Sequence, residues 1–189
     1  MSRPPQQHHF ASAWKKISRR IRVPLGFLFV IFYFWWARPN VRSLLASLLL
    51  VVPGLLLRGY ASGYVKKNTE LTVTGPYAYT RNPLYLGSIL IAFGFALAER
   101  NVWIAAALAV LFIAIYWPVI LGEEEFLRAQ FPGYEAYAKR VPRLFPRFRV
   151  QDKRGGEFSF DLYRRHREYN SLLGTLFIYL ILIARIFWH

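Results

Sequence analysis

The stretch GPYAYTRNPLYLGSILIAFGFALA, from Gly75 to Ala98, places a polar turn directly before a long apolar segment. Gly75 permits a positive φ and Pro76 fixes the next φ, so a turn is expected there. Pro83 suits the first position of a helix and Asn82 suits the N-cap, so we expect a helix to begin at this point. The helix N-terminus and Arg81 would together attract negatively charged groups. On these residues alone, an interfacial turn with a snorkelling arginine explains the pattern equally well.

The composition of the chain is that of a membrane protein. Its 189 residues are 55% hydrophobic and 18% aromatic, yet they carry a formal charge of +15. Long uncharged runs do not suit a nucleic-acid-binding domain, whereas apolar runs between clusters of Lys and Arg are typical of an integral membrane protein. Cysteine is absent, and the four histidines form no cluster with carboxylates at helical spacing. The sequence therefore predicts no thiolate chemistry, no metal site and no nucleic-acid partner.

Five apolar segments are long enough to predict membrane-spanning helices, some of them only just. They are Val23–Ala37, Ser43–Leu57, Leu84–Ala98, Val102–Leu121 and Leu172–Trp188. Pro53 and Pro118 are expected to bend two of them, which neighbouring helices tolerate in a bundle. If the N-terminus is cytoplasmic, 21 of the 25 Lys and Arg residues lie on the inside, as the positive-inside rule expects.

The sequence thus predicts an all-α integral membrane protein with about five transmembrane helices, the N-terminus inside and the C-terminus outside. We divide this single domain, residues 1–189, into a basic tail (1–22), a helical hairpin (23–57), a polar-motif core (58–150) and a joint with the last span (151–189). The basic tail before an apolar run also fits a signal peptide. No small-residue cleavage site follows, which favours an uncleaved anchor in the cytoplasmic membrane.

A second polar cluster, GEEEFLRAQF, follows the fourth predicted span at Gly122. Three carboxylates at a helix C-terminus oppose the helix dipole. On a continuing helix, Glu123, Glu124 and Glu125 point about 100° apart, so they cannot all face the same place. One or two of them are expected to point into the bundle, although a solvated acidic patch paired with nearby arginines is the commoner fate of such runs.

A third cluster, GYEAYAKRVPRLFPRFR, begins at Gly133. Tyr134 and Tyr137 share an apolar face with Ala138 and Val141, and the basic residues lie elsewhere on the helix. This pattern predicts a short interfacial helix. All three clusters lie on the cytoplasmic side in the predicted topology.

In this order, the three clusters resemble the isoprenylcysteine carboxyl methyltransferase family and the related phospholipid methyltransferases. The family pattern is Gly-Pro-Tyr, then Arg-His-Pro-x-Tyr-x-Gly opening a span, a second span, Glu-Glu-x-x-Leu, and a helix closing with Val-Pro-Arg-x-x-Pro. This chain has GPYAYTRNPLYLG, EEEFL and VPRLFP in matching positions between Glu70 and Arg147. The resemblance implies an integral membrane methyltransferase that uses S-adenosyl-L-methionine in cytoplasmic loops. It implies a lipophilic or lipidated acceptor and contact with membrane lipids.

The resemblance also implies site residues. Arg81 and Glu123 would be catalytic. The cofactor-binding residues would be Thr69, Glu70, Leu71, Thr72, Tyr77, Arg81, Asn82, Pro83, Leu84, Tyr85, Glu123, Glu124, Tyr137 and Arg143. The chain departs from the family at two positions. Asn82 replaces the family histidine, which removes any general base there. Val119 stands where the eukaryotic carboxyl methyltransferases have an arginine for the substrate carboxylate, which weakens the case for a prenylated cysteine substrate.

Two other readings remain open. A sterol-reductase-like protein that uses NADPH shares part of this C-terminal pattern, although it normally has more spans and a Trp where Gly75-Pro76-Tyr77 stands. A non-catalytic membrane protein would use Arg164, Arg165 and Arg167 to bind anionic lipid. The amine, carboxylate, thiol or hydroxyl nature of an acceptor does not follow from the sequence.

Overall fold

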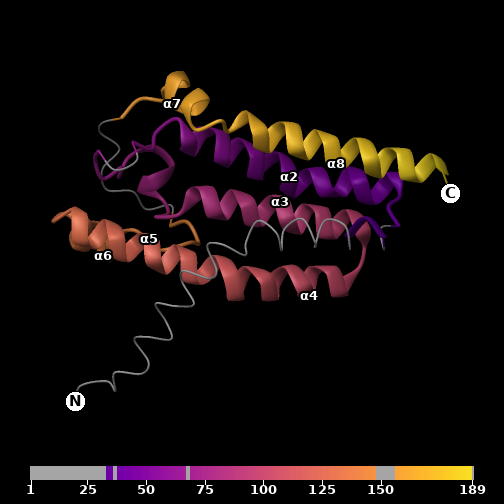
Figure 1. The fold of residues 1–189 in the computed structure, drawn as a ribbon, viewed down its shortest axis with the longest axis horizontal. Coiled ribbons are helices and arrows are strands. Elements are labelled where there is room, and N and C mark those ends of the chain that lie inside the picture. The colour runs from indigo at the N-terminus through magenta and orange to yellow at the C-terminus, as the bar shows by residue number, and fades with distance from the viewer. Residues whose placement is uncertain (1–32, 36–37, 67–68, 148–155, 189) are drawn as a thin grey trace, which may run out of the picture.

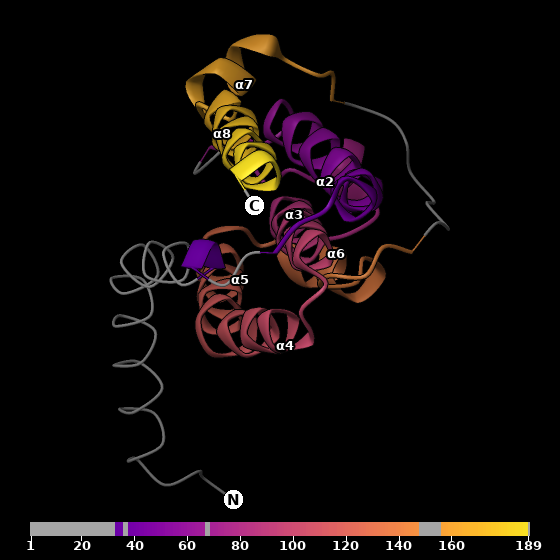
Figure 2. The same cartoon turned by 90° about the vertical axis from the view of Figure 1, so that its right-hand side faces the viewer.

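The computed structural model describes residues 33–35, 38–66, 69–147 and 156–188, and every regular element within these ranges is helical. The helix α2 (Val41–Ser62) packs along α3 (Pro83–Glu99), with α8 (Tyr169–Trp188) beside α2. The helix α4 (Val102–Leu111) lies on the opposite side of α3, as the end-on view in Figure 2 shows. The long helices run roughly along one axis (Figure 1), which is the arrangement expected of a membrane bundle.

Three of the described helices are long and apolar enough to cross a membrane: Val41–Ser62, Val102–Gln130 and Tyr169–Phe187. They correspond to the second, fourth and fifth predicted spans. The third predicted span forms α3, an apolar helix of 17 residues that is shorter than the other three. The first predicted span, Val23–Ala37, lies outside the described residues except for 33–35, which are helical.

The contact between α2 and α3 depends on small residues. A Cβ atom on Gly54 would lie 2.8 Å from the carbonyl oxygen of Gly87, and one on Gly94 would lie 2.4 Å from Val51 Cγ2. Ser47 and Gly54 are spaced seven residues apart, as are Gly87 and Gly94, so each pair lies on one face of its helix. In a bilayer the hydrophobic effect contributes little to helix association, because lipid tails are as apolar as the side chains. Close van der Waals packing of the backbones drives association instead, and small residues make this close approach possible. Gly87, part of the opening motif, therefore serves packing.

The helical segment Val102–Gln130 is continuous, but its hydrogen-bond pattern changes just before Pro118. After α4 the chain makes one π-helical segment, η2 (Phe112–Tyr116), and then continues as α5 (Trp117–Gln130). Proline lacks an N–H and its ring clashes with the carbonyl one turn earlier, and a π segment is one way for a helix to absorb that defect. The predicted disturbance at Pro118 therefore appears as a widened turn. Pro53 lies inside α2, which remains one helix.

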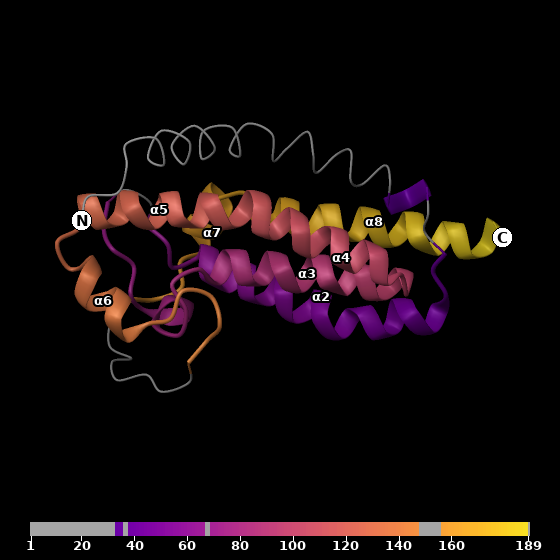
Figure 3. The same cartoon turned by 90° about the horizontal axis from the view of Figure 1, so that it is seen from below.

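The polar motifs gather at one end of the bundle. Figures 1 and 3 show α6 (Tyr134–Arg140) and the end of α5 there, and α7 (Phe160–Arg165) lies nearer that end than the C-terminus does. The short 3-10 turn η1 (Gly75–Ala78) precedes α3 at the same end. The C-terminal end of α8 lies at the opposite end of the bundle. The motifs that the sequence assigns to one membrane face therefore do share one end of the structure.

We predict that Gly54→Ala lowers the free energy of unfolding by about 1–3 kcal/mol, because the added methyl group meets backbone that cannot move aside cheaply. Thermal unfolding in detergent micelles measures the loss. Gly174→Ala in α8 is the matched control, since no atom lies within 4 Å of its Cβ position. That substitution should leave stability unchanged or raise it by roughly 0.5–1 kcal/mol. Equal losses in the two variants would contradict the role assigned to the α2–α3 contact.

Candidate active site

The turn before α3 is fixed by its own backbone and by α6. Gly75 has a φ of +59°, a left-handed conformation that glycine adopts without strain. A side chain there would also collide with the ring of Tyr64, at 2.6 Å. The carbonyl oxygen of Tyr77 accepts a hydrogen bond of 2.8 Å from the hydroxyl of Tyr137 in α6. The first and third sequence motifs are therefore in direct contact.

A buried carboxylate, Glu124, joins all three motifs. Its side chain is 3% exposed and forms ion pairs with Arg81 Nη1 at 3.3 Å and with Arg143 Nε at 3.0 Å. The side-chain amide of Asn82 donates to the other carboxylate oxygen at 3.2 Å. The cost of desolvating a carboxylate is offset only when its oxygens are paired and hydrogen-bonded in this way. Removing Glu124 would leave two guanidinium groups without their partner.

Arg81 is positioned by several contacts and keeps one donor unused. Its backbone N–H donates to the carbonyl of Pro142 at 2.9 Å, and its Nη1 also reaches the hydroxyl of Tyr134 at 3.3 Å. The Nε atom is buried and has no hydrogen-bond partner within the described part of the chain. Since a buried N–H without an acceptor is costly, this atom marks a place where an acceptor from a ligand would be stabilised.

Asn82 does not act as the sequence predicts. It precedes α3 at the N-cap position, but its side chain makes no cap hydrogen bond. The amide instead donates to Glu124 and to the carbonyl of Arg143 at 2.9 Å. The expected side-chain cap is therefore wrong, because long-range polar partners compete successfully with the local backbone N–H groups. A non-titrating amide is sufficient for the two bonds that Asn82 makes.

A cavity of about 270 Å³ lies against this network, slightly below the ~300–1,000 Å³ of ordinary small-molecule sites. It brings together twelve of the fourteen predicted cofactor-binding residues: Glu70, Leu71, Thr72, Tyr77, Arg81, Asn82, Pro83, Leu84, Tyr85, Glu123, Glu124 and Tyr137. Thr69 and Arg143 do not line it. Thr69 donates to the carbonyl of Lys66, and Arg143 lies behind Glu124, 5.3 Å from the ring of Trp117. The binding roles of these residues stay predictions.

The cavity also has lining residues that the motif comparison missed: Val65, Lys66, Phe126, Leu127 and Tyr134. For three of these residues, helical spacing could have predicted that they line the cavity. Phe126 and Leu127 follow Glu123 by three and four positions, and Tyr134 precedes Tyr137 by three, so each lies on the same helix face as its predicted neighbour.

The three consecutive glutamates divide as the 100° spacing requires. Glu124 is buried in the network, whereas Glu125 is exposed. Glu123 is also exposed, but it lines the cavity and accepts a hydrogen bond of 2.9 Å from Tyr85 Oη. Glu123 therefore lies at the rim of the cavity, where its carboxylate can contact both solvent and a ligand.

Three tyrosines of the cavity, Tyr77, Tyr134 and Tyr137, have raised pKa values and remain neutral near neutral pH. Burial, reinforced by the charge of Glu123, raises the pKa of Tyr77. Burial likewise raises the pKa of Tyr137 and of Tyr134. The apolar face of α6, predicted to lie on the membrane, buries both of these tyrosines within the protein. These side chains provide aromatic walls and neutral hydroxyl donors, and the shifted pKa values exclude them as bases near neutral pH.

Comparison with known proteins is consistent with this geometry. Residues 48–133 match the family described as phospholipid methyltransferase, which confirms the resemblance that the motifs predict. The three long apolar helices indicate an integral membrane protein, and the family match covers a little less than half of the chain.

Two relatives are similar to the chain. One is a nickel-cobalt-cadmium resistance protein of Alcaligenes xylosoxydans xylosoxydans, 40% identical over 88 residues, which are 47% of this chain and 40% of the relative. The other is a cobalt-zinc-cadmium resistance protein of Cupriavidus metallidurans, 36% identical over 114 residues, which are 59% of this chain and 52% of the relative. The aligned parts thus span about half or less of these relatives. No solved structure gives a significant match.

We predict that Glu124→Ala lowers the free energy of unfolding by roughly 3–5 kcal/mol, since it removes the carboxylate partner of the largely buried Arg81 guanidinium and of the partly exposed Arg143 guanidinium. Glu125→Ala, on the same helix but exposed, should change it by less than about 0.5 kcal/mol. Chemical or thermal unfolding of both variants in micelles checks the difference. A Glu124→Ala protein as stable as the Glu125→Ala protein would mean that the buried network does not hold the motifs together.

Proposed function

We propose that the protein transfers a methyl group from S-adenosyl-L-methionine to a lipophilic acceptor at the membrane surface. The observation that carries the proposal is the single cavity shared by the turn before α3, the Glu123–Glu124 segment and α6, three motifs far apart in the sequence. The matching family supports methyl transfer as the reaction class. The relatives' printed names concern metal resistance of those proteins, and no cluster of three metal-ligating side chains occurs among the described residues.

The side chains of the cavity fit such a cofactor. The unpartnered Nε of Arg81 would donate to the carboxylate of the amino-acid part. Glu123 and Tyr85, at the rim, would accept from and donate to its ribose hydroxyls or amino group. The rings of Tyr77 and Tyr137 would pack against the adenine or face the sulfonium, where a cation–π contact contributes roughly 0.5–2 kcal/mol.

The protein's own contribution to catalysis would be alignment and exclusion of water. The sulfonium supplies an activated methyl group, which the acceptor's lone pair takes while the electron pair of the broken bond stays on sulfur. Glu124 and the tyrosine face of α6 hold the walls of the site rigid, and Asn82 holds Glu124 without titrating. The proton lost by an amine, thiol or hydroxyl acceptor would leave to solvent at the open rim.

The direct test is titration of the purified protein with S-adenosylhomocysteine and, separately, with NADPH. Binding of the first alone supports the proposal, whereas binding of NADPH alone would favour the sterol-reductase-like alternative. Binding of neither would favour a non-catalytic lipid-binding protein. Incubating the protein with membrane lipid extract and labelled S-adenosyl-L-methionine then identifies the acceptor by its acquired label.

We predict that Glu123→Gln raises the Kd for S-adenosylhomocysteine roughly tenfold or more, because a hydrogen bond to a charged group is worth about 1.5–3 kcal/mol. Glu125→Gln, which removes the same charge from an exposed residue that does not line the cavity, should leave the Kd unchanged. Calorimetric titration of both variants gives the comparison. Equal effects would show that Glu123 acts only through its charge and makes no direct contact.

The proposed orientation places the cavity on the cytoplasmic side of the inner membrane. Because the chain has no cysteine, single cysteines report the topology directly. We predict that Gly133→Cys, at the exposed start of α6, resists an impermeant thiol reagent on intact cells. Arg42→Cys, at the opposite end of α2, should react. The reverse labelling pattern would overturn the orientation while leaving the site itself intact.

A further inference from the structure

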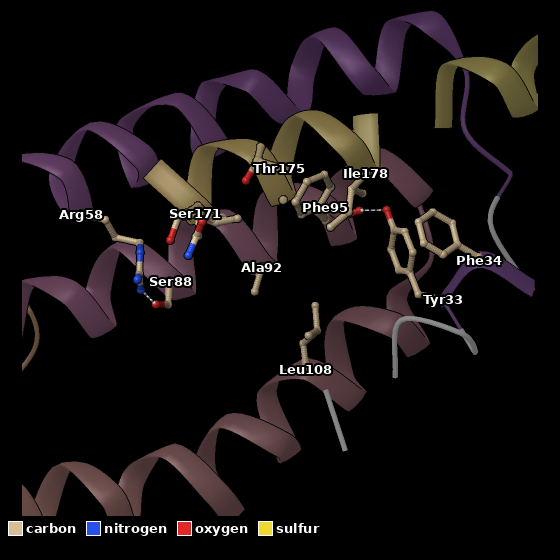
Figure 4. Close-up of a pocket in the computed structure, with 13 residues that line it drawn as sticks. Tyr33, Phe34, Arg58, Ser88, Ala92, Phe95, Leu108, Ser171, Thr175 and Ile178 are labelled. Atoms are coloured by element: carbon tan, nitrogen blue, oxygen red, sulfur yellow. Dashed lines mark hydrogen bonds between the residues drawn. The ribbon is translucent and has the colours of Figure 1, made fainter. Parts of the chain in front are cut away.

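A second cavity lies farther along α3, beyond the first turn that lines the first cavity (Figure 4). Its volume is about 420 Å³, within the range of small-molecule sites. Side chains from α3, α4 and α8 point into it, and Tyr33 and Phe34 lie at its far end, where the hydroxyl of Tyr33 donates to the carbonyl of Phe95. The cavity is separate from the one assigned to the cofactor, since no residue lines both.

The shape of this cavity follows the helices. On α3 it is lined by Ser88, Ala92 and Phe95, at i, i+4 and i+7, which is one helix face. On α8 the lining positions run from Ser171 through Gly174 and Thr175 to Ile178, again one face. Seven helical residues extend about 10 Å along the axis. The cavity is therefore elongated in the direction of the spans, and its charged group, Arg58, lies at one end with Ser88, Asn170 and Ser171.

The polar end is built around Arg58 of α2. Its guanidinium forms a two-point ion pair with Glu168, at 2.5 and 3.1 Å, and donates to the hydroxyl of Ser88. It also donates to the carbonyl of Leu84 at 3.3 Å. Leu84 lines the first cavity, so the polar end of the second cavity meets the wall of the first. Burial is the main cause of the raised pKa of Tyr77 in the first cavity. The charge of Glu168 also raises this pKa, and the charge of Arg58 lowers it.

These features define the kind of ligand that would fit. Beyond Arg58 and Ser88 the walls are mainly apolar side chains, with Thr175 and Tyr33 as the polar exceptions, so an apolar chain would be favoured there. A charged or strongly polar group would be accommodated best at the Arg58 end, next to the first cavity. An amphiphile lying parallel to the helices satisfies both conditions.

We propose that this second cavity binds the apolar chain of the methyl acceptor, an amphiphile whose polar group lies at the Arg58–Ser88 end beside the cofactor cavity. The inference rests on the proposed function and adds where the acceptor binds. Five of the thirteen residues that line the cavity belong to α8, which lies outside the segment that matches the methyltransferase family. The length and width of the accepted chain would therefore be set in part by α8.

Gly174 offers a way to fill the cavity without distorting the fold. It lines the cavity, and no atom lies within 4 Å of its Cβ position. Gly174→Leu should therefore occupy space that the acceptor chain needs. Leu173→Phe is the matched control, because Leu173 is the preceding residue of α8 and its side chain is 58% exposed on the bundle surface.

The first measurement is independent of catalysis. The protein is placed in vesicles of phosphatidylethanolamine and phosphatidylglycerol that contain a photoactivatable diazirine analogue of palmitic acid, and labelled residues are mapped by mass spectrometry. We expect labelling of Ala92, Leu108 or Thr175 in the wild type and in Leu173→Phe, and a loss of roughly tenfold in Gly174→Leu. Absence of labelling at these cavity residues in the wild type, or its persistence in Gly174→Leu, would overturn the proposal.

The second measurement separates an acceptor from a structural lipid. Methyl transfer from labelled S-adenosyl-L-methionine into lipid extract should show a KM for acceptor raised roughly tenfold in Gly174→Leu, with S-adenosylhomocysteine binding unchanged. If the wild type transfers methyl groups and Gly174→Leu does so equally well, the cavity holds a structural lipid and the acceptor role is wrong. If the wild type neither binds S-adenosylhomocysteine nor transfers methyl groups, the proposed function fails, and the acceptor role fails with it for that separate reason.

Discussion

The burial of one carboxylate, Glu124, is the constraint on which the polar end of the molecule depends. Arg81, Asn82 and Arg143 come from two segments separated by more than fifty residues, and all three direct donors to its two oxygens. A carboxylate taken out of water requires such partners, and Arg81, Asn82 and Arg143 supply them together. The turn before α3, the end of α5 and the segment after α6 are therefore ordered together.

This arrangement separates the structural from the ligand-facing groups within a single run of glutamates. Glu124 has its oxygens committed to the protein, while Glu123 remains at the rim with a single hydrogen bond from Tyr85. Arg81 belongs to both sets, since Nη1 serves Glu124 and Tyr134 whereas Nε is left without a partner in the described structure. A rigid wall with few unsatisfied donors is what a reaction governed by alignment needs.

The sequence predicted the meeting of the motifs and missed the details that only tertiary packing decides. Their order around two apolar spans placed them at one end, and twelve of fourteen predicted residues line one cavity. The orientation of the glutamates was not predictable, because the π segment at Phe112–Tyr116 changes the phase of α5 relative to the preceding span. The side-chain role of Asn82 was mistaken because a local cap was weighed without its distant partners. The Arg58–Glu168 pair, 110 residues apart, left no periodic signal.

Under the proposed function, the position of α3 would allow the protein to bind two ligands of opposite polarity. Its contact with α2 is fixed by glycines at Gly54, Gly87 and Gly94, so the helix cannot move away from α2 without losing close backbone packing. Its first turn lines the polar cavity at the end of the bundle, and its following turns line the apolar cavity that runs along the spans. A charged cofactor would enter from water and an apolar chain from the bilayer. One helical turn of α3, from Leu84 to Ser88, separates the two cavities. Under the proposed function the methyl group would therefore pass near the Arg58–Leu84 contact, where the two cavities meet.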